Sequence, residues 1–136
     1  MSQELSRLLI EFYERFNNWE HEVVADTGLT PAQVHAVEII GHMEAPKMNA
    51  LAKKLGVTMG SLTVMIDRLE KLKLAKRQRN PKDRRSYEIV LMKKGQKLFA
   101  EHERKHNHLT NELCSCFSEA EEAEFVTLLN KMIGQF

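Results

Sequence analysis

Two histidines near the C-terminal end have the spacing of a metal-binding pair. His102 and His106 are four residues apart in a segment with helical periodicity. Their imidazoles therefore project from one side of the helix, where they can converge on one ion. Solvated helices also contain such pairs, and two ligands do not complete the tetrahedral shell of zinc. A metal site here needs further ligands from other elements.

A second chemical feature is the basic segment in the middle of the chain. Between Lys47 and Lys97 there are 15 lysines and arginines against 4 acidic residues, and the remainder has 5 against 15. The formal net charge of +1 therefore conceals a local excess of +11. A polyanion would feel this excess over a screening length of about 8 Å at physiological salt. The segregation indicates a nucleic acid partner, although a solvated protein face can also carry such a run.

Length and composition are typical of one globular domain. The chain has 136 residues, of which 43% are hydrophobic and 29% charged. It lacks the run of about 20 apolar residues that a membrane span needs, so we expect no membrane partner. Two cysteines, Cys114 and Cys116, are too few and too close for a disulfide framework, which agrees with a reducing compartment. We expect a cytoplasmic protein.

Both ends of the chain are predicted to be helical. Apolar residues recur every three or four positions over about 3–26 and again over about 93–135. Within the second segment, Ser118 and Glu121 have the spacing of a capping box that opens a last helix. The central segment between these arms, about 60 residues, is too small to bury helices this apolar. We therefore expect the arms to bury each other across the two-fold interface of a homodimer.

The central segment, about 30–97, has the order of elements of a winged helix-turn-helix. Thr30 and Gln33 form a capping box that opens one helix, and Gly56 joins two further helices over about 49–55 and 59–72. Residues 80–86 are turn-rich and charged, and strand-forming segments flank them, which predicts a β-hairpin with a basic tip. The expected fold is mainly α with this small hairpin as a wing.

These segments together resemble the MarR family of winged helix-turn-helix transcription regulators. The likeness is carried by Leu29-Thr30-Pro31-Ala32-Gln33, Leu51-Ala52-Lys53-Lys54-Leu55-Gly56-Val57, Leu69-Glu70-Lys71-Leu72, Asp83-Arg84-Arg85, Val90-Leu91 and Lys94-Gly95. It implies one MarR-type domain over 1–136, a homodimer, and sequence-specific binding of double-stranded DNA that a metal ion or small molecule modulates. Lys73 and Met92 stand where the family usually has glycine and threonine. A lysine in a left-handed C-cap costs about 1 kcal/mol, which alters the turn without removing the fold.

The expected DNA contacts fall into three groups. Short polar side chains at the start of the recognition helix fit the major groove, which is about 12 Å wide. They are Thr58, Ser61 and Thr63, although Thr58 can also serve only as a cap and Ser61 can be merely solvated. The wing residues suited to the minor groove are Lys82, Asp83, Arg84 and Arg85, with Asp83 expected to brace an arginine. Phosphate contacts are expected from Lys53, Lys54, Arg68, Lys76 and Arg77.

The histidines extend the likeness to the zinc-responsive branch of the family. That resemblance implies zinc as cofactor and co-repressor, with a ligand set of Glu22, His35, His102 and His106. One carboxylate and three imidazoles would complete a tetrahedral shell. The metal would then tie the first two helices to the fifth, beside the DNA-binding lobe. The branch's second metal site lacks its cysteine and glutamate here.

Other functions stay open at this point. A MarR-type regulator can respond to a small organic ligand of phenolic type, with the histidines incidental. Thiol redox sensing could use Cys114 and Cys116, although residues two apart point to opposite sides of a helix. The sequence contains no HExxH, glycine-rich phosphate loop or GxSxG motif. A zinc shell of four protein ligands also leaves no position for water, so we expect no enzymatic activity.

Overall fold

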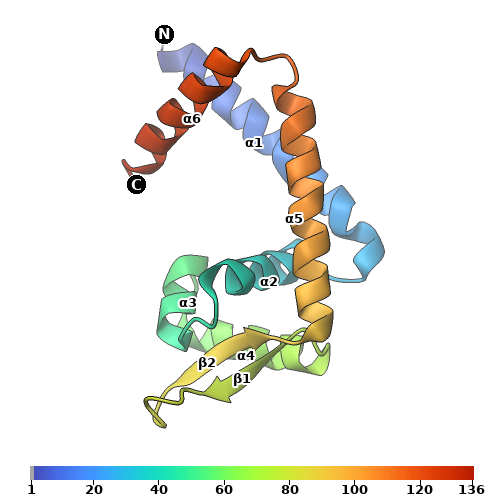
Figure 1. Cartoon of the computed structure of the whole chain (residues 1–136), viewed down its shortest axis with the longest axis vertical. Coiled ribbons are helices and arrows are strands. Elements are labelled where there is room, and N and C mark those ends of the chain that lie inside the picture. Colours follow the sequence, from blue (N-terminus) through green and yellow to red (C-terminus); the bar gives the residue numbers. More distant parts are fainter. Residues whose placement is uncertain (1) are drawn as a thin grey trace. The chain divides into compact units, whose positions relative to one another are not determined.

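The computed structural model describes residues 2–136 and confirms a mainly helical fold with one β-hairpin (Figure 1). In order, the elements are α1 (Ser2–Val24), the 3-10 turn η1 (Ala25–Thr27), α2 (Pro31–Met43), α3 (Met48–Leu55), α4 (Met59–Lys71), β1 (Ala75–Arg79), β2 (Tyr87–Leu91), α5 (Lys93–Cys114) and α6 (Glu119–Ile133). The chain divides into two compact units, Met1–His102 and Glu103–Phe136, with the boundary inside α5. Among the described residues, no helix combines the length and apolarity needed to span a membrane.

Both predicted capping boxes are present. The Thr30 hydroxyl accepts a hydrogen bond from the Gln33 backbone amide, and the Gln33 side chain accepts one from the Thr30 amide, each at 3.1 Å. Ser118 and Glu121 repeat this exchange at the start of α6, at 3.2 and 2.8 Å. Each box satisfies two amides that a helix start would otherwise leave without partners. The starts of α2 and α6 therefore follow from local sequence.

The helix-turn-helix has its own hydrophobic core, made by α2, α3, α4 and the hairpin. Its fully buried side chains include Val37, Ile40, Leu51, Leu62, Ile66, Leu69, Leu74 and Ile89. Gly56 ends α3 at φ 67°, a left-handed conformation that glycine adopts without steric cost, and the chain then turns into α4. Burial of one stripe of α4 leaves its opposite side facing solvent.

The hairpin is attached to the rest of its unit along β2 and at its base. β1 and β2 pair antiparallel from Ala75 opposite Leu91 to Arg79 opposite Tyr87. The Ile89 amide donates to the Pro46 carbonyl at 2.9 Å, which attaches the connection before α3 to β2. A Cβ atom at Gly95 would lie 2.0 Å from the Leu74 carbonyl oxygen, so only glycine permits this approach of α5 to the hairpin base.

Three residues other than glycine have left-handed backbone conformations. Lys73 adopts φ 59° after α4, as the sequence predicts from its place at a C-cap position. Glu44 and Ala45 adopt φ 52° and 58° between α2 and Pro46, a pair that the sequence did not predict. Such residues carry a steric cost that the surrounding contacts must offset. Here the neighbouring Pro46 carbonyl bonds to β2 and fixes the path of this connection.

Candidate nucleic-acid interface and the His102 cluster

The exposed side of α4 lies opposite its buried stripe. Leu62 and Ile66 have no exposed surface, whereas Val64 is 69% exposed. At 100° per residue, Gly60 and Arg68 fall on the same outward side as Val64, one turn before and one turn after it. Both are exposed. This outward face is the part of α4 that can enter a groove.

The three polar residues expected to contact DNA have different environments. The Thr58 hydroxyl accepts from the Ser61 amide and donates to the Ser61 hydroxyl, both at 3.1 Å, so Thr58 acts as the cap of α4. Ser61 is exposed and retains a hydroxyl proton that it can donate outward. The Thr63 hydroxyl donates to the Met59 carbonyl at 2.9 Å, within the helix. Ser61 is therefore best placed to contact a base edge or phosphate.

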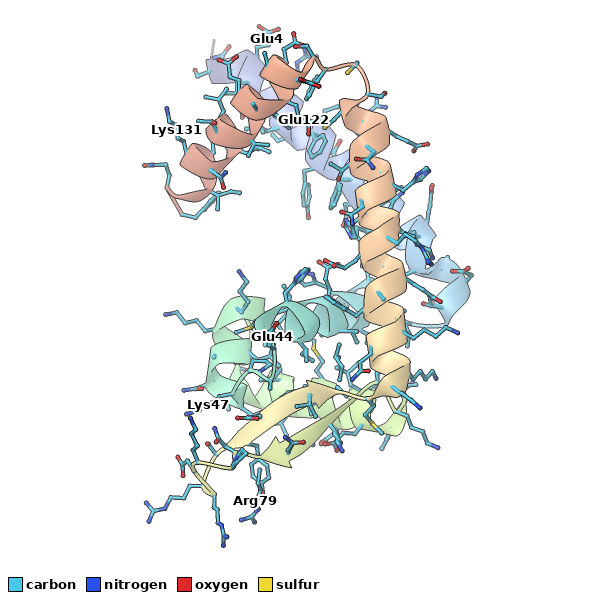
Figure 2. The ribbon with its side chains drawn as sticks, in the orientation of Figure 1. Glu4, Glu44, Lys47, Arg79, Glu122 and Lys131 are labelled. Atoms are coloured by element: carbon cyan, nitrogen blue, oxygen red, sulfur yellow. The ribbon has the colours of Figure 1, made fainter. Side chains whose placement is uncertain are left out.

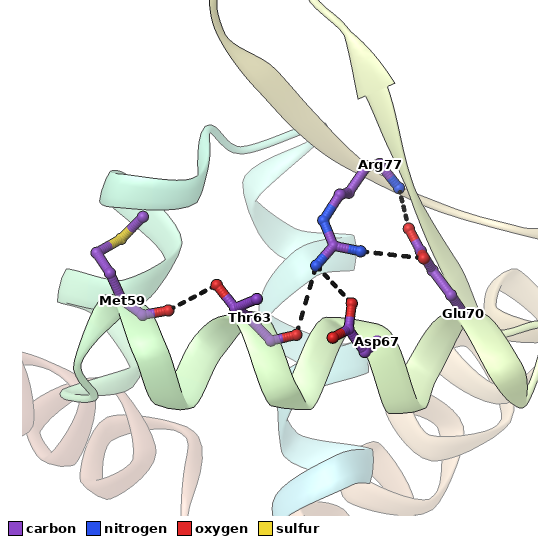
Figure 3. A network of polar contacts seen from close by, with 5 residues as sticks. All are labelled: Met59, Thr63, Asp67, Glu70 and Arg77. Atoms are coloured by element: carbon purple, nitrogen blue, oxygen red, sulfur yellow. Dashed lines mark hydrogen bonds and ion pairs between the residues drawn. The ribbon is translucent and has the colours of Figure 1, made fainter.

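Arg77 connects the hairpin to α4 through a polar network (Figure 3). Its guanidinium lies 2.7 Å from the Asp67 carboxylate and 3.0 Å from that of Glu70, and its amide donates to Glu70 at 2.9 Å. Burial opposes the charge, but the hydrogen bonds to Asp67 and Glu70 outweigh it and raise the pKa of Arg77 above its ordinary value. Its charge is engaged within the protein, so we infer that Arg77 positions the hairpin against α4. The salt dependence of DNA binding tests the phosphate contact expected from the sequence.

We expect Arg77→Met to weaken specific DNA binding about tenfold without changing its salt dependence. The variant loses the link between hairpin and α4, but it loses no phosphate contact, and each such contact contributes about 0.9 to the slope of log affinity against log salt. Lys76→Met is the matched control, because Lys76 is the exposed neighbour on β1. Fluorescence anisotropy titrations at several salt concentrations give the slope of log affinity against log salt for each of the two variants. A slope reduced by about one in Arg77→Met would contradict the positioning role and restore the phosphate contact.

Backbone hydrogen bonds organise the wing tip. The Asp83 carboxylate accepts from the Arg85 amide at 3.0 Å, so Asp83 braces the turn through the backbone of an arginine. The Asn80 side chain likewise accepts from the Lys82 amide at 2.9 Å. The side chains of Lys82, Arg84 and Arg85 are exposed. The tip thus presents three cations on an ordered turn.

Arg79 is a further cation of the wing that the sequence analysis did not single out. It lies at the end of β1 and projects from the hairpin (Figure 2). Its guanidinium stacks 5.7 Å from the centre of the Tyr87 ring and donates to the Arg84 carbonyl at 3.4 Å. These contacts link the strand end to the tip and add positive charge beside it.

Among the residues that the structure describes, His102 is the polar side chain that is buried, at 4% exposed. Its Nε2 atom lies 3.1 Å from a carboxylate oxygen of Glu38 on α2 and 3.4 Å from one of Glu20 on α1. Carboxylates from α1 and α2 thus meet beside one imidazole nitrogen, which is a set of groups that a metal cation could bind.

The family follows from comparison with known proteins. The sequence profile of the MarR family matches residues 29–87. The uncharacterized HTH-type transcriptional regulator YcgE of Bacillus subtilis (strain 168) is 32% identical over 107 residues, which cover 78% of this chain and 69% of that relative. The chain belongs to the MarR family.

Two other MarR-like proteins match nearly the whole chain. The HTH-type transcriptional regulator MhqR of Bacillus subtilis (strain 168) is 28% identical over 133 residues, covering 98% of this chain and 91% of the relative. The crystal structure of Streptococcus pneumoniae FabT in complex with DNA matches with a TM-score of 0.89 at 23% identity, covering 98% and 96% of the two chains, which supports the fold. As a MarR-family protein, the chain is a DNA-binding transcription regulator. At the level of the family, this agrees with the expectation of no enzymatic activity.

In this MarR-family chain the acidic neighbours of His102 differ from the expected ligands. Glu22 and His35 are both exposed. Glu22 is two residues from Glu20, about 200° around α1, and therefore faces away from the side that carries Glu20. The carboxylates beside His102 are those of Glu20 and Glu38, which the sequence analysis missed. Sequence spacing alone does not identify these two glutamates. Which residues of α1 and α2 lie beside His102 depends on how those helices pack against it.

Three further residues named in the sequence analysis, His106, Cys114 and Cys116, lie in the second unit. His106 follows His102 by one turn of α5 and is partly buried. Cys114 is the last residue of α5 and is also partly buried, whereas Cys116 is exposed beyond the helix end. Both thiols are free.

Proposed function

We propose that this MarR-family regulator is a dimeric repressor whose α4 reads the major groove while its wing enters the adjacent minor groove. The outward face of α4 carries this proposal, because Gly60, Val64 and Arg68 are exposed on a helix whose other side is fixed in the core. The ordered cations at the wing tip suit the narrow, negative minor groove. The local charge of +11 over residues 47–97 adds non-specific attraction to the phosphates.

A homodimer accounts for the apolar surface of the two terminal helices. On α1, Leu5, Leu8 and Phe12 are 51–55% exposed, and on α6 Phe125, Leu128 and Ile133 are 41–64% exposed. Contiguous exposed apolar residues of this kind mark interaction sites. In a two-fold dimer that buries them, two copies of α4 would lie one DNA turn apart, about 34 Å, and read a palindromic site.

We further propose that a divalent metal ion, with zinc as first candidate, binds at His102, Glu20 and Glu38. Zinc bonds to nitrogen and oxygen measure about 2.0–2.1 Å, so neighbouring ligand atoms in a tetrahedral shell are about 3.3 Å apart. The distances of 3.1 and 3.4 Å from His102 Nε2 to the two carboxylates match that separation. The donor types suit the ion, and each carboxylate lies at a distance from Nε2 that two ligands of one shell would have.

His106 is the fourth ligand that helical spacing offers, four residues after His102 on α5. The resulting set has two imidazoles and two carboxylates, which suits zinc. It contains one more hard oxygen ligand than the set of three imidazoles and one carboxylate expected from the sequence. A metal held this way ties α1 and α2 to α5, which follows the wing directly. It would then favour one arrangement of the DNA-binding lobe, with a typical coupling of about 1–3 kcal/mol.

Buffered zinc is expected to change DNA affinity about tenfold, or about 1.4 kcal/mol. The protein is stripped of metal and titrated by fluorescence anisotropy on an operator, meaning a duplex selected with this protein from a random-sequence library. Titrations with and without buffered zinc use constant salt, because salt alone shifts such affinities. Tighter binding makes zinc a co-repressor, and weaker binding makes it an inducer. A change below about twofold would contradict metal regulation.

Glu20→Gln and Glu22→Gln form the matched pair that tests the ligand assignment. Both carboxylates lie on α1, but only that of Glu20 is near His102. Loss of one ligand should weaken zinc binding at least tenfold in Glu20→Gln, and Glu22→Gln should bind as the wild type does, as measured with a chromophoric zinc competitor. Glu38→Gln repeats the test from α2. Weakening by Glu22→Gln alone would overturn the assignment.

A further inference from the structure

We propose that Val64 is a specificity-determining residue, which recognises the methyl group of a thymine in the major groove. This inference rests on the proposed DNA-reading role of α4. Val64 is 69% exposed, whereas Leu62 and Ile66 on the same helix are fully buried. Its side chain therefore contributes nothing to the core, and its place at the middle of the outward face puts it where a base edge would lie.

The thymine C5-methyl is the apolar group that base pairs present in the major groove. The other side chains on this face are polar or absent, since Gly60 precedes Val64 by one turn and Arg68 follows it. A methyl contact is thus the form of base recognition that Val64 chemistry allows. Valine is also a poor helix former compared with alanine, so helix stability gives no reason for it here.

The surroundings of Val64 favour close approach of DNA. Asp67, one turn further on, would repel phosphates, but its carboxylate is paired with Arg77 at 2.7 Å. On the other side, a Cβ atom at Gly60 would meet no neighbouring atom nearer than 4.0 Å, so this position is open space. The charge beside Val64 is therefore compensated, and Gly60 presents no side chain to a base pair.

The test removes methyl groups from both partners. In the operator, single thymines are replaced by deoxyuridine at symmetric positions of the two half-sites, and the wild type and Val64→Ala are titrated on each duplex. One lost methyl contact is expected to weaken binding by about fourfold per half-site. At one thymine position, replacement by deoxyuridine should weaken binding of the wild type but not of Val64→Ala, because the variant has already lost the methyl contact.

Met59→Ala is the matched control, because Met59 is an apolar residue of the same helix that is 48% exposed, and its substitution leaves Val64 in place. Deoxyuridine should weaken binding of this control variant as much as it weakens binding of the wild type. An equal penalty in the wild type and Val64→Ala, or no penalty at any thymine, would overturn the role of Val64. In either case specific operator binding by the wild type would leave the DNA-reading proposal standing. Failure of the wild type to prefer any selected duplex over scrambled DNA would overturn both.

Discussion

Placing two negative charges on the apolar face of α6 is expected to lower operator affinity by more than about 100-fold. Leu129→Glu with Ile133→Glu changes two residues that are 37% and 64% exposed and one helical turn apart. Buried in a dimer interface, the unpaired charges would cost several kcal/mol and separate the protomers. A single winged helix then reads one half-site and loses the effective-concentration advantage of roughly 10²–10⁴ that linked sites have.

Lys131→Glu is the control for this variant. Lys131 is in the last turn of α6, about 160° around the helix from Leu129 and therefore on its polar side. It introduces negative charge on the same helix and should leave both dimer and DNA binding nearly unchanged. Sedimentation velocity at micromolar concentration reports the mass, and anisotropy reports the affinity. A double variant that sediments as a dimer would refute the proposed interface.

Removing the two arginines of the wing tip is the second large change. We expect Arg84→Ala with Arg85→Ala to weaken operator binding more than about tenfold, since arginines in a narrow minor groove contribute about 1–3 kcal/mol each. The tip turn should keep its shape, because the Asp83 side chain accepts from the Arg85 backbone amide, which alanine retains.

The wing variant also separates DNA contact from metal binding. Its zinc affinity should equal that of the wild type, because the wing and the His102 cluster share no residue. Arg104→Ala is the matched control, an exposed arginine on α5 outside the winged helix. Equal losses of zinc and DNA affinity in the wing variant would indicate unfolding or a wrong assignment of the two sites.

Much of the fold follows from local sequence. The capping boxes at Thr30 and Ser118 predicted the starts of α2 and α6, and both form in the structure. The turn-rich segment 80–86 predicted the hairpin, and β1 and β2 lie on either side of it. These signals act within a few residues and need no tertiary context. The left-handed pair at Glu44 and Ala45 has no such signal, and it lies beside a tertiary contact, the hydrogen bond from the Ile89 amide of β2 to the Pro46 carbonyl.

The candidate sites were less predictable, because they depend on contacts between distant elements. Nothing local distinguishes Glu20 from Glu22, yet only Glu20 faces His102. Arg77 resembles a phosphate-binding residue until its ion pairs with Asp67 and Glu70 are known. Val64 was missed for another reason, since a search for hydrogen-bonding side chains passes over a valine whose exposure the sequence does not reveal.

The most direct test of the central claim compares the operator with a scrambled duplex of the same length and composition. Wild-type protein is titrated on both by fluorescence anisotropy, at one physiological salt concentration and with buffered zinc. Specific regulators bind their sites at least about 10³ times more tightly than other DNA, and we expect a ratio of that size here. A ratio near one would contradict the claim, because the basic segment alone would then account for all binding.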